Sequence, residues 1–487
     1  MKYTTFLSTL LICLFFGSCG DDKEPQSKRK DIPKNIAWIE DTMRDHYYWY
    51  KDIPSEDRLD YTLNEKDFFM SLLSESDGKK YITSSGTRHN YFSNIKNLSD
   101  PATYSIRSSS GQGKISYGFE LMSVYTNPTH TNMQLLVQYV LKDSPAEESG
   151  IKRGDWITHI EDKPITSSDF SAILNGGGEV TLIIQRWDSE RKRHVTVPEK
   201  INLPAAREVL DNPIHTAKVI TTPSKGKKVG YLVYNHFTKG ISDNDNSYDN
   251  ELRKLSGTTF DGVDEFVLDL RYNGGGYISS AAILCAILAP KATLGKPLCY
   301  LKYNDKSYPK ESVINAGEDL LKPNGKNLNL STLYVLVSSS SASASEMLIN
   351  SLRPYMKEVV IIGEQTLGKN VASNAYTSSD KAWEINPIIC IVYNSERNAD
   401  YANGFPPDYK LNEAFTPTLQ DPNIVTLDEV RELGDENERL LRVALNLIDG
   451  TDSAPRSAEL EKGPFYTVAP FNSISHRATN GTIIDID

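Results

Sequence analysis

The sequence predicts an α/β protein whose main domain is preceded by two smaller units. Long apolar runs alternate with helical patterns from about residue 219 to residue 448, which is typical of a sheet whose buried strands are separated by helices. Short strands and turns occupy residues 103–197. Residues 36–73 instead show the spacing of amphipathic helices.

Length and charge set the first limits. A chain of 487 residues is too long for one hydrophobic core and favours about three domains. The formal net charge is −11, and the lysines and arginines are scattered rather than gathered in a stripe. Nucleic acid is therefore not an expected partner, because no basic surface is available to neutralise phosphates.

Residues 1–18 are predicted to be a signal peptide. Lys2 precedes an apolar run, residues 6–16, that is too short to span a membrane. Residues 16–19 resemble a bacterial lipobox, which implies that Cys19 is lipidated and begins the mature chain. The acidic segment behind it resembles the surface-export signal of Bacteroidetes lipoproteins, and residues 19–32 are predicted to be a tether. We expect an exported protein, lipid-anchored in the cell envelope at the outer membrane; an ordinary cleaved signal peptide is the alternative.

Three cysteines remain once the signal peptide and Cys19 are set aside: Cys285, Cys299 and Cys390. So few thiols do not indicate a domain built on disulfides, although one bridge is compatible with the count. Cys285 lies in an apolar run and is predicted to be a core residue.

Residues 33–103 are predicted to form a small helical domain. Apolar residues at Ile36, Ile39 and Met43, and again at residues 68–73, recur with helical spacing. The aromatic cluster at residues 47–50 could stack against sugar rings, but core packing is the favoured interpretation.

Residues 104–200 carry the signals of a third kind of unit. Ser144 can cap a short helix that opens with proline, Gly150 ends that helix, and a Gly-Asp turn leads into the next strand. This order of signals resembles a PDZ domain, a fold that binds an extended peptide along a strand edge. The resemblance implies a peptide-binding segment made of Tyr117, Gly118, Phe119 and Glu120.

Residues 201–450 are predicted to form the α/β core. Its last helix spans about residues 435–448 and is ended by Gly450. Residues 451–487 are expected to be a polar, loosely held tail.

The segment 340–346, Ser-Ser-Ala-Ser-Ala-Ser-Glu, is the strongest candidate for chemistry. It connects an apolar strand-like run to a helix-like run. A serine at such a junction gains access, backbone donors and a favourable helix dipole together. A serine hydroxyl is nevertheless a weak nucleophile until a base removes its proton. Lys369 could be that base if burial lowers its pKa from about 10.4 to near 7, which corresponds to about 4 kcal/mol against the charged form.

A glycine-rich turn is the second candidate element. The sequence Asp-Leu-Arg-Tyr-Asn at residues 269–273 ends a buried strand, and three glycines follow at residues 274–276. Consecutive glycines let backbone N–H groups point at a developing negative charge, although glycines also serve simply to reverse a chain.

These motifs occur in a characteristic order: the PDZ-like unit, Asp-Leu-Arg with glycines, Ser-Ala-Ser-Ala-Ser-Glu, and Gly-Glu-Gln-Thr-Leu-Gly-Lys. That order, over roughly residues 104–412, resembles the C-terminal processing, or tail-specific, serine peptidases, and the helical N-terminal part is similar to Bacteroidetes versions. The resemblance implies a catalytic core similar to the ClpP and crotonase folds. It also implies an endopeptidase that holds extended or unfolded polypeptides with its PDZ domain and needs no metal or organic cofactor.

The resemblance implies the following roles: Ser343 as the nucleophile, Lys369 as the general base, and the N–H groups of Ala344 and Gly275 as the oxyanion hole. Two positions depart from the family pattern. The glutamine that many members carry four residues after the lysine is Ser373 here, which becomes the candidate group for orienting Lys369. The acidic residue that some members carry after the serine falls near Pro354.

Three other interpretations stay open. Residues 363–369 also match a phosphate-binding loop, except that Asn370 stands where Ser or Thr should ligate magnesium. His236 could replace Lys369 as the base of a Ser-His hydrolase. Finally, the chain could be a catalytically inactive surface protein that binds peptides through its PDZ domain. The expected partners are protein or peptide substrates and, through Cys19, a membrane.

Overall fold

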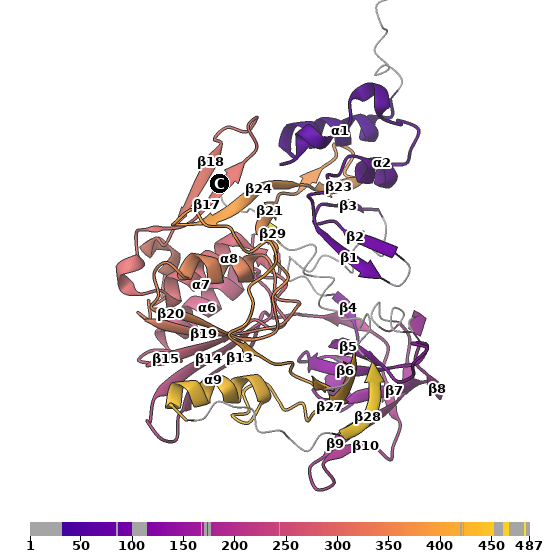
Figure 1. Cartoon of the computed structure of the whole chain (residues 1–487), viewed down its shortest axis with the longest axis vertical. Coiled ribbons are helices and arrows are strands. Elements are labelled where there is room, and N and C mark those ends of the chain that lie inside the picture. The colour runs from indigo at the N-terminus through magenta and orange to yellow at the C-terminus, as the bar shows by residue number, and fades with distance from the viewer. Residues whose placement is uncertain are drawn as a thin grey trace, which may run out of the picture.

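The computed structural model contains the three predicted units, with the N-terminal domain near one end of the molecule, the PDZ unit near the other, and the α/β core beside both (Figure 1). It describes residues 32–466 and 482–483, except for residues 84–85, 100–113, 167, 170–172, 174–176, 243, 419–420, 422 and 452–460. The predicted signal peptide, Cys19 and most of the tether lie outside the described residues. Within them, no helix has the length and apolarity needed to cross a membrane.

The N-terminal domain contains the two expected helices, α1 (Lys34–His46) and α2 (Glu65–Ser71). The residues with helical spacing, Ile36, Ile39 and Met43, are buried on one face of α1. This face packs in a hydrophobic cluster that also contains core residues such as Val371, Ile385 and Ile388. The domain is therefore attached to the core by shared apolar packing, and Tyr47 of the aromatic cluster is fully buried in it.

The same domain also contains strands that the sequence did not predict. They are β1 (Lys79–Thr83), β2 (Gly86–Asn90) and β3 (Asn94–Asn97). The β3 strand pairs with β23 (Trp383–Asn386), which also pairs with β22 (Tyr376–Thr377). These strands are short, polar and partly exposed, so they lack the alternation of apolar residues by which a strand is detected in a sequence.

The PDZ unit forms a twisted antiparallel sheet. Ser144 caps the short helix α4 (Pro145–Glu148) by accepting the Glu147 N–H at 3.2 Å, and Gly150 after it has a φ of 72°. Its strands are β5 (Phe119–Tyr125), β6 (Met133–Val140), β7 (Trp156–Ile160), β8 (Lys163–Pro164), β9 (Val180–Asp188), β10 (Arg193–Thr196) and β11 (Ile201–Leu203), beside the pair β4 (Lys114–Ser116) and β12 (Arg207–Val209).

The sheet of the PDZ unit extends beyond the predicted bounds of 104–200. Three later strands continue it past β5: β26 (Phe415–Pro417), β27 (Ile424–Leu427) and β28 (Glu461–Tyr466). Part of the expected loose tail is therefore a strand. Pairing between segments so distant in sequence leaves no local pattern, so neither the extension nor β28 could be seen in the sequence.

The α/β core is built on a six-stranded sheet. Its strands, in spatial order, are β13 (Ile214–Thr221), β14 (Lys228–Tyr234), β15 (Glu265–Asp269), β19 (Thr332–Val337), β20 (Glu358–Gly363) and β25 (Tyr409–Lys410). All neighbours except β13 and β14 run parallel.

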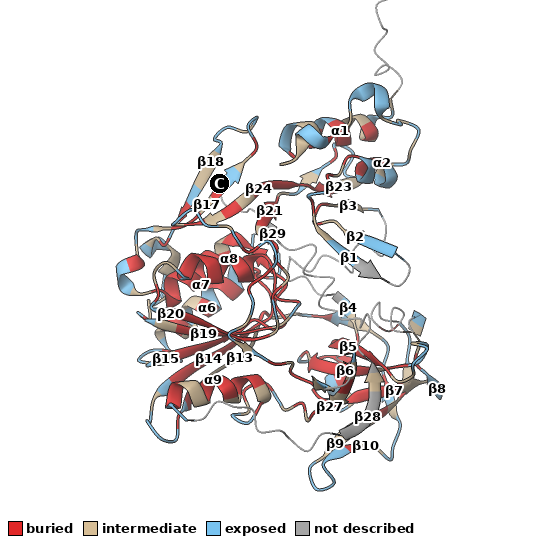
Figure 2. Cartoon of the chain, viewed as in Figure 1, coloured by how far each residue is buried: buried red, intermediate tan, exposed pale blue. Residues whose placement is uncertain are grey.

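Helices cover both faces of this sheet (Figure 1). One face carries α6 (Ser247–Gly257), α7 (Ile278–Leu288) and α8 (Ala344–Leu352), and the other carries α9 (Arg439–Asp449). Alternate strand residues therefore join two separate hydrophobic clusters, so that both faces are buried, which explains the continuous apolar runs in the sequence. Figure 2 shows α7 and α8 buried almost throughout. Gly450 ends α9 with a φ of 70°, as predicted.

A second sheet of the core lies between the first sheet and the N-terminal domain. Its order is β16 (Gly276–Tyr277), β29 (Thr482–Ile483), β21 (Val371–Ser373), β24 (Ile388–Asn394), β17 (Pro297–Tyr303) and β18 (Glu311–Asn315). The β29 strand is a second element of the expected loose tail. Cys285, Cys299 and Cys390 are buried free thiols of the core.

A buried ionic cluster joins the PDZ unit to the core. Arg271 of the Asp-Leu-Arg motif contacts Asp269 at 2.8 Å and Glu438 at 2.7 Å, while Arg153 of the PDZ unit contacts Glu413 at 2.8 Å. Glu413 also contacts Arg271 at 3.2 Å, so it links the two arginines. Burial alone would raise the pKa of Glu413, but the two guanidinium groups lower it to about 2.

Replacing Glu413 with glutamine is expected to lower the free energy of unfolding by about 3 kcal/mol or more, because both arginines lose a buried counter-charge. The folded-state pKa of Glu413 lies below its ordinary value of 4.5, so this stabilisation is complete above pH 4.5 and is lost as the pH falls toward 2. Urea unfolding at pH 7 and pH 3 measures both effects.

The control is Asp305→Asn, which removes a carboxylate from an exposed pair with Lys51. This variant should unfold at the same urea concentration as the wild type, since exposed ion pairs contribute little. A Glu413→Gln protein that also behaves like the wild type at pH 7 would contradict the stabilising role of the cluster.

Candidate active site

Ser343 occupies a strained turn between β19 and α8. It is the residue that precedes α8, with φ 64° and ψ −114°, an unusual conformation for a residue other than glycine. Such backbone strain costs about 1–3 kcal/mol and is characteristic of functional turns. Its Oγ is buried and has no hydrogen-bond partner among the described residues. The predicted nucleophile is therefore held at the start of a helix, as expected, but is not engaged with a base in this structure.

The flanking serines of the motif fasten this turn to the glycine-rich turn. The Ser345 hydroxyl donates to the Asn273 carbonyl oxygen at 2.9 Å, and the Ala342 N–H donates to the same oxygen at 3.1 Å. The Ser341 hydroxyl donates to the Leu270 carbonyl oxygen at 2.8 Å. All three serines at 341, 343 and 345 are buried. The small residues of the motif thus bring the two candidate elements into direct contact.

The glycine-rich turn packs tightly against the end of β14. Gly276 has a φ of 138°, and a Cβ built there would lie 2.0 Å from the Phe237 carbonyl oxygen, so only glycine fits. The Gly275 N–H donates to the Asn273 side-chain oxygen at 2.9 Å. Ala344 is the first residue of α8, and the N–H groups of a first helical turn have no acceptor within the helix. For Gly275 to act as the predicted oxyanion donor, the oxyanion must displace the Asn273 oxygen.

Glu346 connects the serine turn to the lysine segment, a role that motif matching did not assign. Its buried carboxylate accepts the N–H groups of Ser343 at 2.9 Å and Lys369 at 2.7 Å. It also accepts the Gly368 N–H and the Thr366 hydroxyl, both at 2.6 Å. The backbones of the two predicted catalytic residues are therefore held by one carboxylate. The Ser-x-x-Glu spacing of a capping box was the sequence signal for it.

Lys369 is buried, with 1% of its surface exposed. Burial lowers its pKa from 10.5 to about 8, even though the nearby carboxylates of Asp77 and Glu346 act to raise it. Its Nζ lies 5.2 Å from the centre of the Phe92 ring. At pH 7 about a tenth of such a lysine is neutral, whereas at its ordinary pKa almost none would be. Burial thus lowers the pKa of Lys369, as a lysine base needs.

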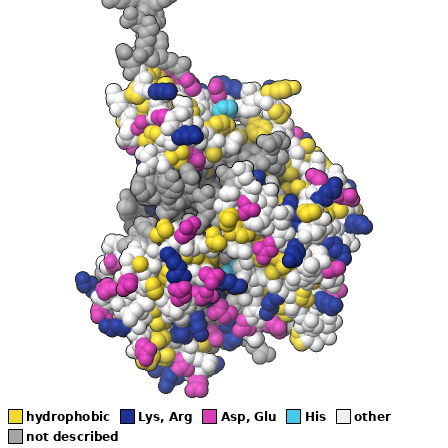
Figure 3. Space-filling model, turned by 180° about the vertical axis from the view of Figure 1, so that it is seen from behind, with side chains coloured by type: hydrophobic (Ala, Val, Ile, Leu, Met, Phe, Trp, Pro, Cys, Tyr) yellow, Lys and Arg dark blue, Asp and Glu magenta, His cyan; other side chains and the backbone are white. Residues whose placement is uncertain are grey.

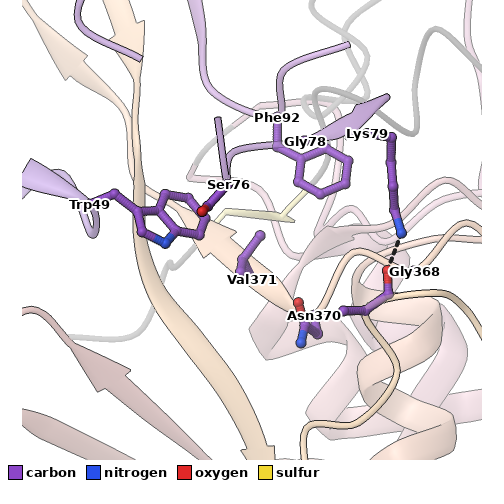
Figure 4. A pocket seen from close by; sticks show the side chains of 9 residues that line it. Trp49, Ser76, Gly78, Lys79, Phe92, Gly368, Asn370 and Val371 are labelled. Atoms are coloured by element: carbon purple, nitrogen blue, oxygen red, sulfur yellow. Dashed lines mark hydrogen bonds between the residues drawn. The ribbon is translucent and has the colours of Figure 1, made fainter. Parts of the chain in front are cut away.

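A small cavity of about 70 Å³ adjoins Lys369 on the side of the N-terminal domain (Figure 4). It is bounded from the core by Gly368, Asn370, Val371 and Ala402, and from the N-terminal domain by Trp49, Ser76, Gly78, Lys79 and Phe92. The N-terminal domain therefore forms one wall of the lysine site. Asp77 and Phe92 escaped the sequence analysis because they lie almost 300 residues from Lys369 in a domain with no catalytic motif.

Comparison with known proteins agrees with this geometry. The model of peptidase family S41 matches residues 228–411, the S41 N-terminal domain matches residues 36–105, and a PDZ domain matches residues 136–186. The crystal structure of an S41 protease candidate from Bacteroides fragilis is 35% identical, covers 85% of this chain and 98% of its own, and superposes with a TM-score of 0.70. The chain belongs to peptidase family S41.

More distant S41 relatives come from staphylococci. A probable CtpA-like serine protease of Staphylococcus aureus is 26% identical over 363 residues, which cover 72% of this chain and 65% of the relative. The chain thus spans slightly less than two thirds of that protein. A protein of the same description from Staphylococcus saprophyticus is 24% identical and covers 98% of this chain and 85% of its own.

The alternative bases and ligands are less well supported by the structure. His236 is buried, and its Nε2 lies 3.1 Å from the Asp211 carbonyl oxygen and 3.4 Å from the Asp211 carboxylate. It makes no hydrogen bond with Ser343 Oγ. The phosphate-loop match fails because Lys369 is followed by the strand β21 instead of a helix. Among the residues that the structure describes, no group of three or more His, Cys, Asp or Glu side chains is placed to hold a metal ion.

Ser373, the candidate for orienting Lys369, is buried on β21. Its backbone pairs with Ile388 on one side and Ile483 on the other. Its role toward the lysine stays a prediction.

The predicted peptide-binding segment opens β5 of the PDZ unit. Tyr117, Phe119 and Glu120 are buried, and the Tyr117 hydroxyl donates to the Gly178 carbonyl oxygen at 2.6 Å. Gly118 has a φ of 84° and lies so close to Ser144 that no side chain fits. The added strand β28 meets β5 at Tyr125, which is the far end from this segment. Peptide binding at the segment stays a prediction.

Replacing Lys369 with methionine is expected to make the fold more stable at pH 7 by up to about 3 kcal/mol, the equivalent of lowering the lysine pKa from 10.5 to about 8. Between these two pH values the folded protein binds fewer protons than the unfolded chain, so the wild type gains stability as the pH rises. The advantage of the variant should therefore shrink from pH 8 to pH 10.5. Chemical denaturation across this range measures it.

Lys357→Met serves as the control because Lys357 is exposed. Its difference from the wild type should not change with pH. If the Lys369→Met difference is equally flat, burial does not control the charge of Lys369.

Proposed function

We propose that this S41 protein is a serine endopeptidase that cleaves extended or unfolded polypeptides through a Ser343–Lys369 dyad. The observation that carries the proposal is the Glu346 carboxylate, which binds the backbone N–H groups of both residues. It accompanies a fully buried lysine whose pKa is lowered to about 8. A shared anchor and a lysine that can lose its proton near neutral pH are what a Ser-Lys dyad requires.

In this mechanism, the neutral Lys369 amine removes the Ser343 proton as Oγ attacks the peptide carbonyl carbon. The oxyanion is stabilised by the Ala344 N–H, at the positive end of α8, and by the Gly275 N–H. The Lys369 ammonium then protonates the leaving amine, and an acyl-enzyme remains on Ser343. A water molecule, deprotonated by Lys369, hydrolyses the acyl-enzyme. Because Ser343 Oγ has no hydrogen-bond partner among the described residues, substrate binding must draw the dyad together.

The PDZ domain is proposed to hold the polypeptide while the core cleaves it. A PDZ strand edge gains affinity from hydrogen bonds to the peptide backbone, so it suits an extended chain. Envelope location through a lipid at Cys19 is also proposed, on the sequence signal alone. Metabolic labelling with a palmitate analogue, compared with Cys19→Ala, tests it; equal labelling would contradict it.

The first test is hydrolysis of an unfolded fluorogenic protein by the form beginning at residue 20. Ser343→Ala and Lys369→Ala should each lower kcat/KM by at least about 10³-fold, the size of loss typical of catalytic groups that act together. Ser339→Ala should be fully active, because Ser339 is an exposed serine of the same segment.

Other outcomes separate the alternatives. Activity retained by Lys369→Ala but lost in His236→Ala would assign the base to His236. If the wild type and Ser343→Ala bind peptides equally and neither cleaves, the chain is a peptide-binding protein and the proposed function is wrong.

A further inference from the structure

We propose that Asp77 of the N-terminal domain is the acidic positioning residue for Lys369. This proposal rests on the proposed function. It names a group that can orient Lys369, because the glutamine that many family members carry four residues after the lysine is Ser373 here. It makes the N-terminal domain a working part of the active site rather than an accessory to the fold.

Asp77 is fully buried and rigidly held. One carboxylate oxygen accepts the N–H groups of Phe92 at 2.9 Å and Ser93 at 3.2 Å. The other accepts the Tyr47 hydroxyl at 2.9 Å. These three donors fix the position of the carboxylate. A negative charge is thus built into the wall of the N-terminal domain that faces the core.

Two observations place that charge at Lys369. Phe92, which donates its N–H to Asp77, also has its ring 5.2 Å from the Lys369 Nζ. The neighbours of Asp77, Ser76 and Gly78, line the same cavity as the neighbours of Lys369, Gly368 and Asn370 (Figure 4). The Asp77 charge acts on Lys369 more strongly than does that of Glu346, and raises its pKa against the larger opposing effect of burial.

Two other charged groups of this region, Glu346 and Lys79, are engaged with other partners. Glu346 accepts hydrogen bonds from four donors of the serine and lysine segments. Lys79, on the opposite wall of the cavity, donates to the Ala402 carbonyl oxygen. Tyr47 donates to Asp77 itself. Asp77 is therefore the charged group best placed to respond when Lys369 changes its charge.

The chemistry explains why such a group is useful. When Lys369 takes the Ser343 proton, an ammonium forms in a buried site where a lone cation is costly. The Asp77 carboxylate stabilises that ammonium, as the aspartate of a Ser-His-Asp triad stabilises the imidazolium that forms beside it. The consequence is a compromise: the lysine pKa rises somewhat, but the charged intermediate becomes accessible.

Asp77→Asn tests this role, since the amide oxygen can still accept the Phe92 and Ser93 N–H groups while the charge is gone. The pH profile of kcat/KM for the wild type should rise through a midpoint near pH 8. Removing the negative charge lowers the pKa of Lys369, so the midpoint should move about 1 unit or more to lower pH. The plateau of kcat should fall about tenfold or more with KM little changed, because the ammonium is less stable.

Glu40→Gln is the matched control. Glu40 is another fully buried carboxylate of the N-terminal domain, and it accepts hydrogen bonds from Arg44 and Tyr61 rather than facing the core. It should leave the midpoint unchanged even if it destabilises the domain. An Asp77→Asn profile with the wild-type midpoint would overturn the proposal.

The rate at which a fluorophosphonate labels Ser343 gives a second reading that needs no peptide substrate. Its pH midpoint should shift in the same direction in Asp77→Asn. Failure of the proposed function looks different, since the wild type would then match Ser343→Ala in both assays.

The short strand β29 supports a second inference. We infer that the segment containing Thr482–Ile483 occupies the place of a substrate strand and competes with a polypeptide for it. This inference also rests on the proposed function. In the second sheet β29 lies between β16 and β21. It pairs in parallel with Gly276 and Tyr277 on one side and with Ser373 on the other.

Both neighbours of β29 belong to the candidate active site. The β16 strand begins at the last glycine of the glycine-rich turn, and β21 begins two residues after Lys369. An extended substrate adds to such strands through the same backbone groups. Ser343 and Lys369 are meanwhile 2% and 1% exposed, so the reacting groups are covered in this arrangement.

Ending the chain at Ala478 removes the segment, whereas Ile483→Pro keeps it but removes a backbone N–H from a strand that is paired on both sides. Both variants should lower KM for an unfolded protein about threefold or more, because a larger fraction of the enzyme is open. A synthetic peptide of residues 478–487 should inhibit the shortened enzyme competitively. An unchanged KM, or a peptide that does not compete, would overturn the inference. If the full-length wild type shows no activity that depends on Ser343, the proposed function is wrong instead.

Discussion

The proposed active site depends on the hydrogen bonds that the Glu346 carboxylate accepts. It is fully buried, and four donors from two separate segments converge on it. Such a group is expensive to bury unless every lone pair is used, so the segments can adopt few other arrangements without leaving a charge unpaired. The strained backbone of Ser343 persists because the Glu346 carboxylate binds the Ser343 N–H and holds this residue in place. The position of Ser343 is thus fixed by its backbone N–H and by the neighbouring segment, while its side chain stays available for the proposed reaction.

Burial has opposite consequences at the two ionic centres of the molecule. Around Arg271, opposite charges compensate one another, so the pKa values of Glu413 and Glu438 are lowered despite burial, and the cluster joins the PDZ unit to the core. Around Lys369, compensation is incomplete, so its pKa falls to about 8 and the amine can exchange a proton. On the face of the molecule seen in Figure 3, acidic and basic side chains are intermixed, as the scattered charges of the sequence indicate. The functional difference therefore lies in how completely each buried charge is paired.

The sequence predicted those features that depend on a short stretch of neighbouring residues. The buried strands, the helix start after Ser343, the helix end at Gly450 and the cap at Ser144 each follow from a short pattern. It did not predict β28 and β29, because pairing of a distant segment depends on edges that exist only in the fold. Asp77 was missed for the same reason. Its neighbours in sequence carry no catalytic pattern, and its proposed role arises from a cavity that is lined by the neighbours of Asp77 and by those of Lys369.

The position of the N-terminal domain follows from the need to bury a lysine without trapping it. The core alone supplies only part of the cover, since Phe92 and the residues around Asp77 complete the wall of the cavity. That wall brings apolar surface, which lowers the lysine pKa, and one fixed carboxylate, which limits the fall. Moving the domain away would expose Lys369 to water and restore its ordinary, fully protonated state near neutral pH. Packing of α1 and Tyr47 against Val371 and Ile388 therefore helps to set the pKa of Lys369, the proposed base.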